Sequence, residues 1–167
     1  MSIIPELNAF AEVISCRGSL VGIDHGRRSI GIAVSDHEQR LASPLSTIVE
    51  KKFRTTAVKL LDICADRAAV GIVLGLPLNM DGTQGKQCQS VRAFAYHLSQ
   101  MTPLPISFQD ERLSSAEAIE IVGSTVARSR AKRDSLIHRV AASVMLQWAL
   151  DEIHKFRGDN ADPFNMT

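Results

Sequence analysis

The chain has 167 residues, of which 45% are hydrophobic and 22% are charged. This composition is that of a globular protein with a sizeable core, and it excludes a disordered or collagen-like chain. The formal net charge is only +1. The whole molecule is therefore no polycation, and any nucleic-acid-binding surface has to be local.

The cysteines and the apolar runs indicate a cytoplasmic protein. Cys16, Cys64 and Cys88 are odd in number and form no C-x-x-C pair, which fits neither a disulfide framework nor a structural zinc site. No run approaches the roughly 18 apolar residues of a membrane span. The first residues carry acids where a signal peptide needs basic residues. We therefore expect reduced thiols and no membrane partner.

The first third of the chain has the pattern of an antiparallel meander. Residues 20–25 and 30–35 are short apolar runs separated by Gly26, Arg27, Arg28 and Ser29, which predicts a hairpin with a compact turn. A third run at 45–49 can add another strand, with Pro44 at its start because proline donates no ladder hydrogen bond.

The rest of the chain alternates between helical and strand patterns. Apolar residues at helical spacing precede the continuous apolar run 70–76, which is typical of a strand covered on both faces. Helices are expected near 57–64, 88–98, 114–122 and 135–156, with a further strand at 106–108. This order predicts an α/β fold in which three antiparallel strands are followed by parallel strands in a mixed five-stranded sheet, with helices on both faces.

Two segments lack either periodicity. Residues 123–134 hold four basic side chains and are expected to form a mobile loop. Residues 158–167 are polar and predict a flexible tail, so one domain is expected over residues 1–157. The basic residues of the expected loop are Arg128, Arg130, Lys132 and Arg133.

Asp24 is the first candidate for chemistry. A carboxylate at the end of an apolar strand is costly to desolvate unless it is paired, hydrogen-bonded or bound to a metal. The alternative is an aspartate that caps the turn.

Asp110 and Glu111 are the second candidates, at the carboxyl end of an expected strand, where α/β sheets usually place ligands. Successive strand residues face opposite sides of the sheet, so only one of the two can point the same way as Asp24. We favour Glu111 as the ligand and Asp110 as its support. An ordinary acid favouring the next helix is the alternative.

A loop and a histidine complete the set. The segment 75–82 ends a strand and turns through Asn79, whose amide could contact a phosphate; a plain turn is equally consistent. His138 lies near the start of the last helix on a face of small residues. A lone histidine there is usually structural.

Four segments in this order, LVGIDHGRRSIGIAVSD, GIVLGLPLNMDG, DERLSSAEA and LIHRVAASVMLQWALD, resemble the YqgF/RuvX family of Holliday-junction-resolvase-like and pre-ribosomal-RNA-processing nucleases. The resemblance covers about residues 20–151 and implies a ribonuclease-H-like fold. It also implies active-site acids at Asp24 and at Glu111, with Asp110 nearby. The third acid of the family precedes the alanine pair of the last segment, where this chain has His138.

The resemblance implies a metal-dependent nuclease. Hydrolysis of a phosphodiester places charge on the attacking and leaving oxygens, and two metal ions roughly 3.5 to 4 Å apart can stabilise both. Asp24, Glu111 and His138 would be the ligands. They would hold Mg²⁺ or Mn²⁺, with Mn²⁺ favoured because imidazole suits magnesium less well than carboxylate does.

Basic residues would hold the backbone of the nucleic acid, which gives affinity without reading sequence. Taken singly, such residues are more often solvated surface. The expected contacts are Arg27, Arg28, Asn79, Arg112, Arg128, Arg130, Lys132 and Arg133.

We therefore expect a hydrolase acting on structured nucleic acid, in the 5′-end processing of pre-16S rRNA or in Holliday junction resolution. One alternative is a catalytically weakened nucleic-acid-binding or ribosome-maturation factor, because of His138. Another is a phosphate loop like that of actin-like ATPases and sugar kinases, which need two such domains. A resolvase would need a homodimer and RNA trimming would not, so the sequence leaves the oligomeric state open.

Overall fold

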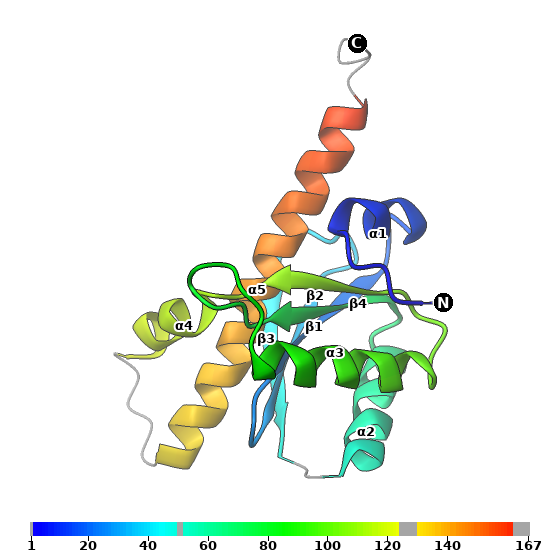
Figure 1. Cartoon of the computed structure of the whole chain (residues 1–167). Helices are drawn as coiled ribbons and strands as arrows, with labels where there is room; N and C mark the ends of the chain where they lie inside the picture. Colours follow the sequence, from blue (N-terminus) through cyan, green and yellow to red (C-terminus); the bar gives the residue numbers. More distant parts are fainter. Residues whose placement is uncertain (1, 50–51, 124–129, 162–167) are drawn as a thin grey trace.

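The computed structural model describes residues 2–49, 52–123 and 130–161. Its centre is a five-stranded sheet in the order β3-β2-β1-β4-β5, in which β1 pairs antiparallel with β2 and parallel with β4 (Figure 1). The mixed five-stranded sheet expected from the sequence is confirmed. The strands are β1 (Ser19–His25), β2 (Ile30–Ser35), β3 (Ala42–Ile48), β4 (Ala69–Leu76) and β5 (Ile106–Asp110).

Helices cover both faces of the sheet. One core lies between the sheet and α2 with α3, and it takes Val21 and Ile23 of β1. The other lies between the sheet and α1 with α5, and it takes Leu20. This division follows from the alternation of side chains along a strand. The helices are α1 (Leu7–Val13), α2 (Phe53–Asp66), α3 (Lys86–Ser99), α4 (Ser114–Val122), which packs on α5, and α5 (Arg130–Ala161).

Close packing of α5 brings its first half onto β1 and β2. A Cβ added to Gly31 of β2 would collide with the backbone carbonyl of His138. One added to Gly22 of β1 would lie 2.8 Å from Cβ of Leu146. Ala141 and Ala142 of the helix are fully buried. Small residues on both partners therefore let the helix backbone approach the sheet and place His138 over the end of β1.

Helix α5 is longer than the sequence pattern predicts. It begins at Arg130 and ends at Ala161, so the expected loop is wrong for residues 130–134 and the expected tail is wrong for residues 158–161. An exposed end of a helix needs no apolar periodicity once its middle is anchored by packing. Arginine, alanine and lysine at residues 130–133 are also good helix formers.

The first helix and the edge strand also differ from expectation. Helix α1 was not expected, because its seven residues are too few to show a helical period in the sequence. It buries Phe10 completely. Pro44 lies within β3, opposite Ala33 and beside a shift in the register. An edge strand with an irregularity tolerates proline, since the missing donor is not needed there. Among the described residues, none of the helices is both long and apolar enough to cross a membrane.

Candidate active site

Two carboxyl groups from separate strands meet at one edge of the sheet. Asp24 lies in β1 next to its last residue, and Glu111 directly follows β5. Each residue is only 7% exposed. Because β1, β4 and β5 run parallel, their carboxyl ends share this edge, where α/β proteins usually bind ligands.

Glu111 occupies a space that a glycine leaves open. Its carboxylate lies against Gly75 of β4, where an added Cβ would overlap with Oε2. This Oε2 atom is buried and has no hydrogen-bond partner among the described residues. Burial, together with the charge of Asp24 and a hydrogen bond to it, raises the pKa of Glu111 to about 10. Glu111 therefore keeps its proton at neutral pH when no metal is bound.

His138 reaches the same place from α5. Its Nδ1 atom lies 3.3 Å from Oδ2 of Asp24, and its side chain is about one-third exposed. The hydrogen bond to Asp24 raises the pKa of His138 above its ordinary value, although burial opposes the shift. The exposed Asp134, one turn earlier, contributes in the same direction. The fold thus brings together the three residues that the sequence singled out as ligands.

These donors fit a divalent cation. The orphaned Oε2 of Glu111 is a buried oxygen that a cation could satisfy. The 3.3 Å between Asp24 and His138 suits two neighbouring ligands of one ion at about 2.1 Å each. Among the described residues, no group of three or more acidic, histidine or cysteine side chains is already spaced to enclose a metal. Water and substrate oxygens would complete such a site, as is usual for magnesium.

The raised pKa of Glu111 predicts how stability depends on pH without metal. Between its ordinary value of 4.5 and about 10, the unfolded chain is ionised while the folded chain holds the proton. The free energy of unfolding therefore falls as pH rises through this window. We expect Glu111→Gln to escape this loss and to be roughly 2–4 kcal/mol more stable than the unchanged chain at pH 8.

Thermal unfolding in a chelator at several pH values measures this effect. The difference in Tm should shrink toward zero near pH 4, because Glu111 is then protonated in both states. Excess metal should raise the Tm of the unchanged protein and have less effect on Glu111→Gln. Equal Tm values for both proteins from pH 4 to 9 would contradict the raised pKa of the buried Glu111 carboxyl.

Asp110 and Asn79 do not join the carboxyl pair. Asp110 is half-buried and accepts hydrogen bonds from the backbone N–H and the Nε of Arg112, whose Nη2 lies 2.7 Å from Oδ2. Nη1 of Arg112 donates to the carbonyl of Met80. Asn79 donates to Oγ1 of Thr83 in the same loop. Asp110 therefore holds Arg112 and the loop in place.

The basic candidates lie on two elements. Arg27 and Arg28 are exposed in the turn between β1 and β2. Arg130, Lys132 and Arg133 are exposed on the first turn of α5. Arg128, the remaining candidate, lies outside the described residues.

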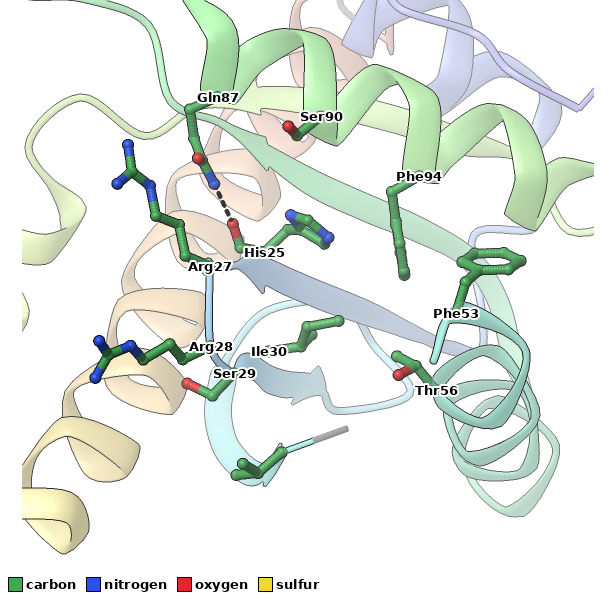
Figure 2. Close-up of a pocket in the computed structure, with 12 residues that line it drawn as sticks. His25, Arg27, Arg28, Ser29, Ile30, Phe53, Thr56, Gln87, Ser90 and Phe94 are labelled. Carbon is green, nitrogen blue, oxygen red and sulfur yellow. Dashed lines mark hydrogen bonds between the residues drawn. The ribbon is translucent and has the colours of Figure 1, made fainter. Parts of the chain in front are cut away.

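A cavity that sequence reasoning missed adjoins the β1–β2 turn. It has a volume of about 880 Å³. In Figure 2, Arg27 and Arg28 lie on one side of it, and Phe53, Thr56 and Phe94 lie on the other. Its walls come from β1, α2 and α3, so no local pattern indicates it. A possible signal was His25, a polar side chain next to Asp24 in an apolar strand; burial lowers its pKa.

The sheet topology and the buried carboxyl pair at the end of β1 match what the resemblance to ribonuclease-H-like nucleases implies. A family model described as RuvX, Holliday junction resolvase, matches residues 18–152. The chain belongs to this family, which confirms the resemblance seen in the sequence. It also confirms the expected class, a hydrolase that acts on phosphodiester bonds of nucleic acid.

Curated relatives are similar over most of their length. A protein of Bradyrhizobium sp. (strain ORS 278), named "Putative pre-16S rRNA nuclease", is 51% identical over 142 residues, which are 84% of this chain and 87% of the relative. A protein of the same name from Paracoccus denitrificans is 48% identical over 90% of this chain and 95% of the relative. The RuvC structure from Thermus thermophilus is 11% identical, with a TM-score of 0.48, over 84% of this chain and 96% of that one.

Proposed function

We propose that this nuclease processes the 5′ end of pre-16S rRNA, with a four-way DNA junction as its second candidate substrate. The relatives that are about half identical over most of the chain carry the first activity in their name. The description of the family model supports the second. The observation that carries catalysis is the buried Asp24–Glu111 pair with His138 beside it.

Asp24, Glu111 and His138 are the proposed ligands of the metal. When bound, divalent ions stabilise the charge that develops on the attacking and leaving oxygens. Glu111 has to release its proton before it can bind a cation, and His138 has to be neutral. Both residues therefore couple metal binding to pH. Asp110 acts by holding Arg112 and the loop around Met80, away from the reacting atoms.

Arginine and lysine residues near this edge are the proposed contacts to the backbone of the substrate. Arg27 and Arg28 follow β1 directly, and the first turn of α5 adds three more cations. Arg112 and Asn79 are already hydrogen-bonded within the 77–85 loop, so we assign them to shaping that loop. Phosphate contacts of this kind give affinity without sequence preference.

The salt dependence of binding tests the cations of α5. We expect the triple variant Arg130→Gln, Lys132→Gln, Arg133→Gln to bind unrelated sequences more weakly. The slope of log affinity against log salt should flatten by up to about 0.9 for each lost contact to duplex DNA. Fluorescence anisotropy of a labelled junction over a range of salt concentrations measures both effects.

A second triple variant is the matched control, since it removes the same charge from the far side of the molecule. It should keep the original slope. An unchanged slope in the α5 variant would show that these cations are ordinary surface. The control substitutions are Arg17→Gln, Arg67→Gln and Lys155→Gln, all at exposed positions.

The replacement of a family acid by His138 favours one other function, a factor that binds precursor RNA but cuts it slowly. Cleavage assays on both substrates, with Mg²⁺ and with Mn²⁺, decide between these functions. We expect metal-dependent trimming of a pre-16S rRNA fragment by the purified protein. Tight binding of that RNA without cleavage under either metal would favour the maturation factor, and cleavage of the junction alone would favour the resolvase.

Three expectations remain predictions that accompany this proposal. A homodimer is needed only if two junction strands are cut symmetrically, and sizing the protein with and without a junction would test it. The second expectation is that the protein is located in the cytoplasm. The assignment of residues 1–157 to one nuclease domain is the third.

A further inference from the structure

The cavity beside the β1–β2 turn has the size of a ligand site. Its volume of about 880 Å³ lies within the range of roughly 300–1,000 Å³ that is usual for small-molecule pockets. The turn forms one wall, the start of α2 another, and the first half of α3 the third (Figure 2). The cavity therefore opens at the same edge of the sheet as the carboxyl pair.

Adjacent residues of β1 face the acidic site and this cavity. Asp24 and His25 are neighbours in β1 and point to opposite faces of the sheet, with His25 lining the cavity. Gly26 also lines it, and a Cβ added there would lie 2.9 Å from Cε1 of His138. A ligand in the cavity would thus lie across one strand from the place where the phosphodiester is cut.

The lining combines aromatic rings with polar and cationic groups. The ring of His25 lies 4.7 Å from that of Phe94, and Phe53 meets Phe94 edge-on at 5.5 Å. The exposed Arg27 and Arg28 stand at the rim, and Gln87 and Ser90 of α3 add polar side chains to the lining. Aromatic faces stack on nucleobases of any sequence, and arginine holds the attached phosphates.

We propose that this cavity receives an unstacked nucleobase of the substrate strand, next to the phosphodiester that is cut. The proposal rests on the function proposed above, because it takes the acidic site as the place of cleavage. Unpaired nucleotides occur in single-stranded precursor ends. Such bases enter a pocket at a lower cost than bases of an intact duplex do.

A plugged cavity tests the proposal. Ser90 lines the cavity and is exposed on α3, so Ser90→Trp fills it from the rim and leaves the core intact. Gln89→Trp is the matched control, because Gln89 is exposed on the same helix and lies outside the lining. Thermal unfolding verifies that both variants keep the stability of the unchanged protein.

The probes are a labelled pre-16S rRNA fragment and a labelled four-way DNA junction, each with a single abasic nucleotide moved along the strand. Binding is measured by anisotropy in a chelator, so it requires no cleavage. At one position we expect the abasic nucleotide to weaken binding by the unchanged protein and by Gln89→Trp about 5- to 150-fold. For Ser90→Trp this ratio should fall to about one, because the base no longer has a site.

Several outcomes would overturn the proposal. One is an abasic scan in which no position weakens binding by the unchanged protein. Another is a Ser90→Trp variant whose ratio of affinities for intact and abasic probes is unchanged. A third is an equal loss of affinity for intact and abasic probes at every position, which would mean that the tryptophan blocks the whole strand. The cavity would instead be a mononucleotide site if the unchanged protein binds a free nucleoside monophosphate, Ser90→Trp does not, and the abasic scan shows no sensitive position. If the unchanged protein cuts neither substrate but still loses affinity at one abasic position, only the proposed nuclease function is contradicted.

Discussion

Asp24→Asn is expected to lose metal-dependent cleavage by at least about 10²-fold, the usual loss when one group that stabilises the transition state is removed. The substitution keeps the shape of the side chain but removes a negative charge from the centre of the site. Asp24 contacts both other proposed ligands, since it lies 3.3 Å from His138 and shares a hydrogen bond with Glu111. Asp24 therefore links the other two proposed ligands.

Substrate binding and folding should survive this change. Loss of the Asp24 charge relieves the electrostatic repulsion on Glu111. The only ion pair that Asp24 forms with a described residue, the one with His138, is lost. Anisotropy in a chelator should therefore give an affinity within about twofold of the unchanged protein, well below one factor of ten, or 1.4 kcal/mol. Asp66→Asn, at an exposed position on α2, is the matched control and should cut normally. Cleavage by Asp24→Asn at the unchanged rate would remove Asp24 from the active site.

His138 is the second residue with a large expected effect. We expect His138→Ala to lose about 10²-fold or more with either metal. The unchanged protein should cut faster with Mn²⁺ than with Mg²⁺, because imidazole suits the later divalent ions and magnesium prefers oxygen. His138→Asp should restore the magnesium reaction, since it returns a carboxylate to the position of the family acid.

The pH dependence of cleavage should follow the same residue. The hydrogen bond to Asp24 raises the pKa of His138 above 6.5, so the proton that competes with metal binds at a higher pH than it does to an ordinary histidine. A protonated histidine cannot ligate. Activity at a fixed low metal concentration should therefore fall as pH drops through a range above 6.5, and His138→Asp should move this fall to lower pH.

His37→Ala is the control for these assays, since His37 is exposed in the loop after β2 at the far end of the sheet. It should leave both the metal preference and the pH profile unchanged. If His138→Ala cuts as well as the unchanged protein under both metals, His138 only packs against Asp24. The exposed Asp134, one helical turn earlier, would then be the next ligand to test.

The catalytic candidates show how far local pattern reaches. Alternation along a strand indicated that only one of Asp110 and Glu111 could point toward Asp24, and the structure places Glu111 there. The effect of this contact on the pKa of Glu111 could be seen only in the tertiary structure. Its pKa is raised by burial and by the charge of Asp24. The carboxylate is buried against Gly75 of another strand, and neither Gly75 nor Asp24 is adjacent to Glu111 in sequence.

The strands of the sheet and its mixture of antiparallel and parallel pairs could be predicted from local pattern, because hydrophobic periods of two and 3.6 residues are local properties of strands and helices. The sequence by itself also determined the family, through four ordered segments. Tertiary structure alone decided the start of α5 at Arg130, since packing of the helix middle on Gly22 and Gly31 stabilises an exposed end without any apolar pattern. It also decided the cavity at His25, which exists only because α2, α3 and the β1–β2 turn meet there. Contacts between distant segments depend on how complete elements pack, and no single segment encodes that.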